Sequence, residues 1–315
     1  MTRIFVTGAA GFIGFHVAKK LLKLGHKVVG IDNVNSYYSI ELKNQRIKEL
    51  KKYHQFKFIK SDIKDIKKYF PLYQPEHVIH LAAQAGVRHS ILNPEAYVDS
   101  NIVGFQAILD ACREHRANLI YASSSSVYGA NQSPFSETQV CNTPQSFYAA
   151  TKLANELAAK AYNHIHQVRS IGLRFFTVYG PWGRPDMAFF RFAAAISQGK
   201  PVEVYNHGDM VRDFTYIDDI VDGIIKAMNL PNTDARIYNL GRGEPVNLMD
   251  AIELLAQNLG KPANIHFLSM QPGDIRETIA DISKARVELN YDPQTSIKEG
   301  VESFSRWFLS TQPQG

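Results

Sequence analysis

The feature that most constrains the fold is a regular alternation of short β-rich runs and helical segments through the first 176 residues. The β-rich runs lie at 4–7, 27–31, 56–59, 77–81, 118–122 and 169–176. Helical periodicity covers 12–24, 40–53, 101–116 and 148–166. Strands that alternate with helices of this length are typical of a parallel sheet covered by helices on both faces. The sequence therefore predicts an α/β fold with a doubly wound parallel sheet.

The regular alternation of strands and helices ends after Tyr179, where proline and glycine separate shorter elements. Further helices are predicted at 219–229, 248–259 and 297–309. This part predicts a smaller C-terminal α+β domain over the carboxyl edge of the sheet. The expected domains are 1–178 and 179–315, with an approximate boundary that allows the two to be interleaved.

Composition excludes several classes of protein. Of the 315 residues 45% are hydrophobic, which is enough for a large core. No apolar run approaches the ~18 residues of a membrane span, and the N-terminus has no signal pattern. The two cysteines lack metal-ligand spacing and cannot form a disulfide framework. The net charge of +5 includes a lysine-rich segment at 43–68, interpreted as a solvated helical face. We expect a cytoplasmic protein with no metal and with neither membrane nor nucleic acid as partner.

A glycine motif, Gly8-Ala-Ala-Gly11-Phe12-Ile13-Gly14, joins the first strand to the first helix. Glycines at such a turn let the backbone approach a pyrophosphate at the helix N-terminus. Asp32 ends the second strand, where a carboxylate would bind the adenosine ribose and repel the 2′-phosphate of NADP. Asp62 and Ile63, after the third strand, could flank the adenine. These signals predict a Rossmann-type NAD site, although the glycines could also make only a tight turn and Asp32 could cap a loop.

A tyrosine and a lysine four residues apart, Tyr148 and Lys152, share one face of a predicted helix. A free tyrosine has a pKa near ~10, and an adjacent ammonium together with a cationic nicotinamide would lower it. The serine run 123–126 precedes them and could relay a proton. The constellation predicts oxidation of an alcohol beside a nicotinamide ring.

With these motifs assembled, the chain resembles the extended short-chain dehydrogenase/reductase superfamily, and within it the nucleotide-sugar epimerases and dehydratases. It is most similar to the UDP-glucuronate 4-epimerases. The strings that carry this resemblance are Ala83–Arg88, Tyr97–Gly104, Arg174–Met187 and Asp213–Asp219. The resemblance implies a tightly held NAD in domain 1–178, a UDP-sugar in domain 179–315, and a homodimer packed through helices 101–116 and 148–166. It places the cofactor at Gly8, Gly11, Phe12, Ile13, Gly14, Asp32, Asn33, Asp62, Ile63, Leu81, Ala82, Ala83, Asn101, Tyr148 and Lys152.

The residues after the fifth strand distinguish the relatives. In these families a tyrosinate takes the 4-hydroxyl proton and a 4-keto sugar forms. The dTDP-glucose dehydratases then use Thr-Asp-Glu before Val-Tyr-Gly to eliminate water, and the UDP-glucuronate decarboxylases carry Thr-Ser-Glu. This chain has Ser124, Ser125 and Ser126 there, ahead of Val127-Tyr128-Gly129. The resemblance therefore implies Ser124 as the proton relay and an epimerisation, in which the hydride returns to the other face.

A glucuronate substrate adds a requirement. Its 4-keto form is a β-keto acid, which loses carbon dioxide unless donors hold the carboxylate. Ser125, Ser126 and Thr177 are the predicted donors, although serines in such a loop also satisfy backbone groups. At the nucleotide end the resemblance implies Arg212 for the diphosphate and Asp274 for the uridine ribose.

Arg88 and Arg184 are predicted diphosphate or carboxylate partners, and any of the three arginines could instead form a structural ion pair. The segment 230–236 is shorter than in most relatives. The sequence thus predicts an isomerase that interconverts UDP-glucuronate and UDP-galacturonate. The alternatives are a UDP-glucose-type 4-epimerase, a UDP-glucuronate decarboxylase and a non-catalytic NAD-binding regulator.

Overall fold

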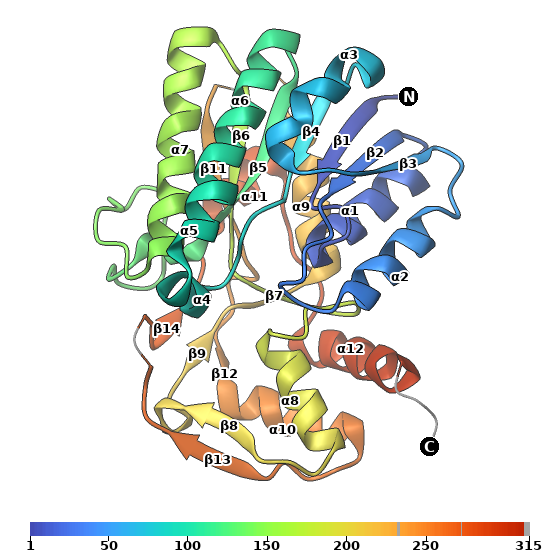
Figure 1. Cartoon of the computed structure of the whole chain (residues 1–315). Helices are drawn as coiled ribbons and strands as arrows, with labels where there is room; N and C mark the ends of the chain where they lie inside the picture. The colour runs from blue at the N-terminus through green and yellow to red at the C-terminus, as the bar shows by residue number, and fades with distance from the viewer. Residues whose placement is uncertain (232–233, 272, 312–315) are drawn as a thin grey trace.

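Seven parallel strands form the central sheet of the computed structural model, which describes residues 1–231, 234–271 and 273–311 (Figure 1). Their order is β11-β6-β5-β4-β1-β2-β3, and every neighbouring pair is parallel. The strands are β1 (Arg3–Thr7), β2 (Lys27–Asp32), β3 (Phe56–Lys60), β4 (His77–His80), β5 (Asn118–Ser124), β6 (Ser170–Phe175) and β11 (Arg236–Leu240). The predicted doubly wound α/β fold is confirmed.

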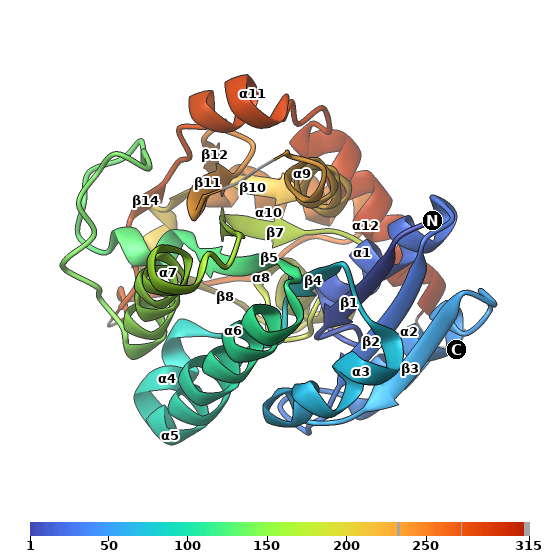
Figure 2. The ribbon, with the colours of Figure 1, turned by 90° about the horizontal axis from the view of Figure 1, so that it is seen from above.

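Helices cover both faces of this sheet (Figure 2). On one face lie α1 (Phe12–Lys23), α2 (Ile40–Leu50) and α9 (Ile217–Met228). On the other lie the 3-10 helix at Ile63–Tyr69, α6 (Gly104–His115) and α7 (Phe147–His166). Helix α1 packs on the sheet because its buried side chains recur at helical spacing and form one apolar stripe that faces the strands.

The chain reverses direction across the sheet between β1 and β4. From β1 it moves outward through β2 and β3, and it then returns to β4 on the other side. Ligands of open parallel sheets bind at such a switch point, outside the carboxyl ends of the strands. The hydroxyl of Thr7, the last residue of β1, accepts the backbone N–H groups of Leu81 and Ala82 at 3.2 Å and bonds to His80 Nδ1 at 2.8 Å. The two strands that border the switch point are thus tied together at their carboxyl ends.

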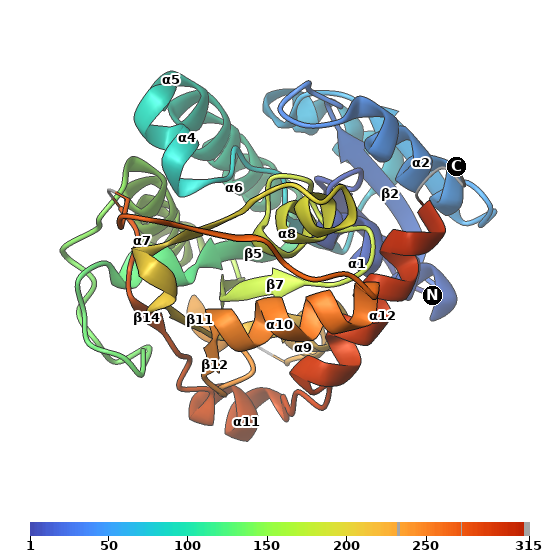
Figure 3. The same ribbon diagram turned by 90° about the horizontal axis from the view of Figure 1, so that it is seen from below.

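A smaller α+β part lies below the carboxyl edge of the sheet (Figures 1 and 3). Its main helices α8 (Ala188–Ser197) and α12 (Ile297–Thr311) both pack on α10 (Leu248–Leu259). The short strands pair as β12-β9-β14 and β13-β8. The strands of this part are β8 (Val202–Tyr205), β9 (Val211–Arg212), β12 (Val246–Asn247), β13 (Ile265–Leu268) and β14 (Glu277–Thr278). Four short helices pack on the first part instead: α3 (Phe70–Tyr73), α4 (Val87–Leu92), α5 (Pro94–Tyr97) and α11 (Ser283–Leu289).

The predicted strand 169–176 differs from the structure at its end. The chain leaves the central sheet at Phe176, and β7 (Thr177–Tyr179) pairs instead with β10 (Phe214–Tyr216). This happens because Thr177 N–H bonds to the carbonyl of Asp213, whereas Phe176 N–H still bonds to Leu240 in β11. Thr177 is therefore turned toward the smaller part of the molecule.

Three elements beyond residue 178 belong spatially to the first part: β11 completes the sheet, α9 packs on α1, and α11 packs on β11 and α9. We therefore propose that the two domains are interleaved. The predicted helix 101–116 also has a different start, because residues Val98–Val103 form a π-helical turn before α6. Among the described residues, no helix combines the length and apolar character of a bilayer span. The shortened segment 230–236 includes residues 232–233, which lie outside the described residues.

Candidate active site

The glycine turn between β1 and α1 lies against the backbone that follows β4. A Cβ added at Gly8 would stand 2.8 Å from both Leu81 C and Ala82 N, and the φ of Gly8 is +69°. A Cβ at Gly14 would stand 2.1 Å from Gly8 O. Side chains are therefore excluded from the turn, as a backbone cradle for a pyrophosphate at the start of α1 requires. The structure thus brings predicted cofactor residues from two chain segments together.

Asp32 holds the glycine turn to the loop after β2. Its carboxylate accepts N–H groups from Ala10 at 3.1 Å and Val34 at 2.8 Å, and the residue is 8% exposed. Burial raises the pKa of Asp32, and the Val34 hydrogen bond, the Lys43 charge and the Ala10 hydrogen bond oppose it. The hydrogen bonds with Ala10 and Val34 are those of a residue that caps a loop, which is the alternative role considered for Asp32. Since a carboxylate has about four acceptor positions, Asp32 can also accept ribose hydroxyls.

The other predicted cofactor residues mostly organise backbone. Asp62 caps the helix that starts at Ile63 by accepting Lys64 N–H at 3.0 Å, and Asn33 approaches the same carboxylate at 3.4 Å. The amide of Asn101, in the π-helical turn, bonds both the N–H and the C=O of Gln84, which follows Ala83. Asn101 also donates to Thr151 Oγ1 at 3.1 Å. It therefore fixes the Ala83 backbone relative to α7.

The predicted catalytic residues converge where β5 ends beside α7. Ser124 closes β5, and Tyr148 and Lys152 lie one helical turn apart on α7. Lys152 is 2% exposed and donates from Nζ to the Ala122 carbonyl of β5 at 2.8 Å. Burial lowers the pKa of Lys152 to about 8, and the charge of Glu156 opposes this shift. Lys152 is therefore mostly charged at neutral pH.

The pKa of the Tyr148 phenol responds to its burial and to two other side chains. Burial raises the pKa of Tyr148, while a hydrogen bond with Ser124 and the charge of Arg184 lower it. The Lys152 ammonium donates to the Ala122 carbonyl, and the lowering of the Tyr148 pKa by Lys152 together with a bound nicotinamide stays a prediction. Arg184 comes from the smaller part of the chain, so the phenol is influenced by both parts of the molecule.

A buried ion pair behind the catalytic helix was not predicted. Arg174 of β6 donates to both oxygens of Glu156, and Ser123 donates to the same carboxylate at 2.5 Å. Glu156 lies four residues after Lys152, so the two share a helical face. The spacing of Lys152 and Glu156 could have been recognised in the sequence, but the pairing of Glu156 with Arg174 on β6 could not.

The predicted carboxylate-binding residues form a second group. Ser126 is bonded to Ser124 through both its N–H and its hydroxyl, at 3.2 and 3.1 Å. These are local bonds of the kind expected of a serine loop. Thr177, the first residue of β7, and Arg184 line one small cavity together with Phe12 of α1, which is a predicted cofactor residue. Arg184 is also ion-paired with Asp186.

The predicted nucleotide-end residues converge as well. Arg88 donates to Asp274 at 2.9 Å and stacks over the Tyr205 ring at 4.3 Å. Burial lowers the pKa of Arg212, and the charge of Asp274 opposes this. The Arg212 guanidinium donates to two backbone carbonyls, those of Val211 and Arg276, at 2.9 Å each. Arg88 thus makes the ion pair that was considered as an alternative, with another predicted site residue as its partner.

The interpretation of residues 43–68 as a solvated face is wrong for the start of that segment. Lys43 is 4% and Arg46 is 0% exposed, because α2 packs beside the glycine turn. Lys43 Nζ donates to the carbonyl and side-chain oxygens of Asn35 at 2.7 and 2.8 Å. The helical periodicity correctly predicted that these residues lie on a lysine-rich helix. It could not predict that another segment of the chain covers them.

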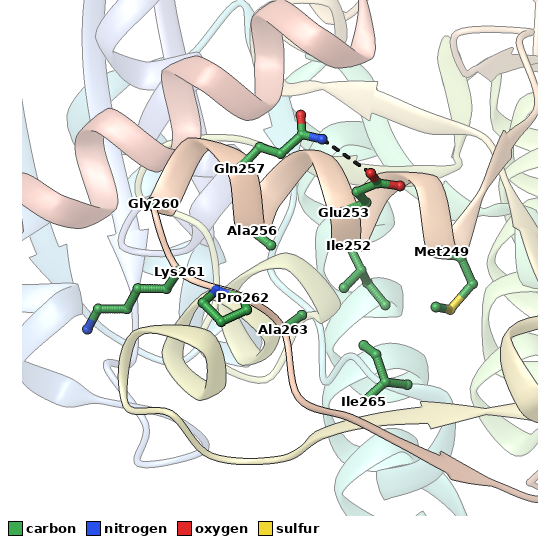
Figure 4. A pocket seen from close by; sticks show the side chains of 10 residues that line it. All are labelled: Met249, Ile252, Glu253, Ala256, Gln257, Gly260, Lys261, Pro262, Ala263 and Ile265. Atoms are coloured by element: carbon green, nitrogen blue, oxygen red, sulfur yellow. Dashed lines mark hydrogen bonds between the residues drawn. The ribbon is translucent and has the colours of Figure 1, made fainter.

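A separate cavity of about 500 Å³ lies along one face of α10 and the segment that follows it (Figure 4). Met249, Ile252 and Ile265 make its apolar wall, and Lys261 lies at its edge. None of its lining residues belongs to the predicted site. Within the described ranges, no three His, Cys, Asp or Glu side chains are grouped as a metal site would need.

Comparison with known proteins agrees with this geometry. The model of the NAD dependent epimerase/dehydratase family matches residues 4–241. The Staphylococcus aureus protein CapI is 48% identical over 98% of both chains, and a probable UDP-glucuronate 4-epimerase of Rhizobium meliloti is 42% identical over 97% of this chain and 96% of its own. The crystal structure of UDP-glucuronic acid 4-epimerase from Bacillus cereus, in complex with UDP-glucuronic acid and NAD, superposes with a TM-score of 0.94 at 37% identity, over 98% of this chain and 99% of that one. The chain therefore belongs to the NAD-dependent epimerase/dehydratase family.

Proposed function

We propose that this protein is an NAD-dependent 4-epimerase that interconverts UDP-glucuronate and UDP-galacturonate. The observation that carries the proposal is the run of hydroxyls at the end of β5, Ser124 to Ser126, beside Tyr148 and Lys152. A general acid there would divert a 4-keto sugar to elimination, and hydroxyls do not. The related enzymes from Rhizobium meliloti and Bacillus cereus carry the same activity in their names.

The glycine turn, Asp32 and the Leu81–Ala82 backbone are the residues that would hold NAD. When bound, NAD supplies the acceptor and donor of the hydride that leaves and returns at carbon 4 of the sugar. The side-chain-free cradle at Gly8 and Gly14 fits its pyrophosphate, and the buried carboxylate of Asp32 fits a ribose better than a 2′-phosphate.

Tyr148 takes the proton from the 4-hydroxyl and later returns it. Its burial opposes the phenolate, so the hydrogen bond with Ser124 and the charge of Arg184 are needed to offset that cost. Ser124 lies within hydrogen-bonding reach and relays the proton. Lys152, held by the Ala122 carbonyl, adds positive charge to the same face of the helix.

The sugar carboxylate needs donors while the keto ring turns over. We assign this role to Ser125, Ser126 and Thr177, because hydroxyls bind a carboxylate without providing an acid for elimination. Arg184 and Thr177 line one cavity, so the guanidinium can contribute a charged donor there. Carbon dioxide loss is suppressed when these donors hold the carboxylate.

The nucleotide end is assigned to Arg88, Arg212 and Asp274. A bidentate guanidinium matches diphosphate oxygens, and a carboxylate matches the uridine ribose. Arg88 is bound to Asp274, so diphosphate binding requires it to divide its donors between the carboxylate and the phosphate. Arg212 is partly occupied by two backbone carbonyls, which hold its guanidinium in place for the ligand.

A homodimer through α6 and α7 is part of the proposal. Three large apolar side chains of α7 are exposed, Phe147 at 40%, Leu157 at 59% and Ile165 at 66%, and Val103 before α6 is 43% exposed. Apolar side chains gathered on adjacent helices are typical of a subunit interface. Leu157→Glu should give monomers in light scattering if α7 makes this interface. The cytoplasmic location stays a prediction.

The purified protein, incubated separately with UDP-glucuronate, UDP-glucose and UDP-N-acetylglucosamine, tests the function by NMR of the products. We expect a mixture of UDP-glucuronate and UDP-galacturonate from the first and no comparable conversion of the others. Formation of UDP-galactose instead would indicate a neutral-sugar epimerase. A UDP-pentose as main product would indicate a decarboxylase.

A further inference from the structure

A buried tyrosine that was not among the predicted site residues, Tyr97 at the end of α5, contacts the ring of Tyr148. The two rings meet edge to face, with 6.1 Å between their centroids and 76° between their planes. This is a preferred geometry of aromatic pairs, because the positive edge of one ring faces the negative face of the other. Tyr97 is 0% exposed, so the packing around it leaves its ring little room to move. The ring of Tyr97 therefore forms a fixed wall beside the phenol of Tyr148.

The hydroxyl of Tyr97 is bound to the turn that follows β4. It donates to the carbonyl of Ala85 at 2.8 Å and to the carbonyl of Gly86 at 2.5 Å. A phenol has one proton, so the two carbonyls share it. Gly86 has a φ of +104°, and a Cβ there would stand 2.8 Å from the hydroxyl of Tyr37. The turn thus has a glycine conformation at the residue that receives the Tyr97 hydroxyl.

The same turn is held by a second side chain. Asn101 bonds to the N–H and the C=O of Gln84, and it also donates to Thr151 of α7. Asn101 therefore ties the turn to α7 at Thr151, whereas Tyr97 ties it to the ring of Tyr148. Residues 84–86 are fixed at three consecutive positions, immediately before the helix α4 that carries the predicted substrate residue Arg88.

We propose that Tyr97 is a positioning residue for the reaction: its hydroxyl, anchored on the Ala85 and Gly86 carbonyls, places its ring so that the Tyr148 phenol stays within reach of the 4-hydroxyl of the sugar. The inference deepens the proposed function and rests on it for the proton transfer by Tyr148. Precise placement matters because a displacement of about 1 Å of a reacting group can cost about 100-fold in rate. The competing explanation is that Tyr97 only fills the core, since a fully buried ring also stabilises the fold.

Two substitutions separate the hydroxyl from the ring. Tyr97→Phe keeps the ring but removes the anchor, and Tyr97→Leu removes both. We expect kcat to fall roughly tenfold in Tyr97→Phe and roughly 100-fold in Tyr97→Leu, with KM for UDP-glucuronate changed by less than about threefold. The control is Tyr291→Phe, because Tyr291 is also 0% exposed and donates to a backbone carbonyl, that of Gly241 at 3.0 Å. Rates are expressed per bound NAD, so that unfolded or empty protein is not counted.

Deuterium at carbon 4 of UDP-glucuronate tells a positioning role from a structural one. If Tyr97 only stabilises the fold, its substitution lowers the melting temperature but leaves kcat unchanged well below that temperature. If Tyr97 positions Tyr148, the slowed step is the one in which the proton and the hydride leave the sugar. The deuterium isotope effect on kcat should then be at least as large in Tyr97→Phe as in the wild-type protein.

The position of the Tyr148 ring can also be followed without a sugar. In NAD-containing protein labelled with ¹³C in its tyrosine rings, the NMR signal of Tyr148 is the one that disappears in Tyr148→Phe. This signal depends on the orientation of the neighbouring aromatic ring. It should move in Tyr97→Phe and stay in place in Tyr291→Phe.

A kcat of Tyr97→Phe within about twofold of the wild-type value would overturn the proposal, whatever the melting temperature. A lower kcat with an isotope effect smaller than in the wild-type protein would overturn it as well, because a step other than hydride transfer would then have been slowed. If the protein converts a different UDP-sugar, the proposed function fails and the same kinetic comparison on that sugar decides the role of Tyr97. If it converts none, the proposed function also fails, and an unmoved Tyr148 signal in Tyr97→Phe would then exclude the positioning role.

Discussion

Replacing Glu156 by glutamine removes the negative charge from the buried ion pair behind the catalytic helix. Arg174 donates to Glu156 at 2.9 and 2.7 Å, and the two side chains are 6% and 3% exposed. Glutamine keeps an acceptor for Ser123 but leaves the Arg174 charge uncompensated in the interior. Removing one partner of such a pair typically costs about 3–5 kcal/mol, so we expect that decrease in the free energy of unfolding.

Urea unfolding followed by tryptophan fluorescence measures this loss, in a double-mutant cycle with Arg174→Met. The double variant buries neither charge, so its loss should be smaller than the sum of the single losses by at least about 2 kcal/mol. The matched control is the exposed pair Glu302–Arg306, at 56% and 75% exposure, where the same substitutions should change stability by less than about 0.5 kcal/mol. A loss below about 1 kcal/mol for Glu156→Gln, or independent effects in the cycle, would refute the reasoning.

The same substitution has a predicted effect on catalysis. Burial lowers the pKa of Lys152 to about 8, and the Glu156 carboxylate opposes this shift. Without Glu156 the pKa of Lys152 falls further, so a larger share of Lys152 is neutral at pH 8 than in the wild-type protein. Turnover of Glu156→Gln, relative to wild type, should therefore fall more at pH 8 than at pH 6.5.

Four further predictions follow from the site and its surroundings. Tyr148→Phe should abolish turnover while NAD stays bound, measured by product NMR and cofactor content; full activity would rule out Tyr148 as the base. Gly14→Ala should weaken NAD binding at least about tenfold, since its Cβ would meet Gly8 O at 2.1 Å. The control is Gly199→Ala, whose Cβ would meet open space although its φ is positive, and equal losses of NAD binding in both would contradict the cradle. Thr177→Ala should raise the UDP-4-keto-pentose by-product in the same NMR assay, and a flat by-product level with unchanged turnover would remove Thr177 from carboxylate binding. Burial lowers the pKa of His80 to about 3, so below pH 6.5 the unfolded chain binds a proton that the folded protein excludes. The free energy of unfolding should therefore fall by up to about 1.4 kcal/mol for each unit by which the pH drops below 6.5. In His80→Asn this contribution to the pH dependence of stability should be absent.

Local patterns in the sequence were sufficient for the fold class and for the first steps of the chemistry. The alternation of strands and helices predicted the sheet, because side-chain period follows directly from backbone geometry. The glycine turn and the spacing of Tyr148 and Lys152 are also local. The structure places the glycine turn at the switch point of the sheet, and Tyr148 and Lys152 beside the end of β5. The hydroxyls at Ser124–Ser126 could also be recognised from the sequence, because they lie directly at the end of a predicted strand.

Only the tertiary structure decided which charges act on those residues. The charge of Arg184 helps to lower the pKa of Tyr148 from a distant part of the chain, and Arg88 pairs with Asp274 although 186 residues separate them. Arg46 looked like a surface residue, but it is buried because the segment after β7 crosses over α2. Sequence periodicity shows which face a side chain occupies on its own element. It does not show which distant segment covers that face, because long-range contacts arise from packing, and packing sets the burial and pairing that shift each charge.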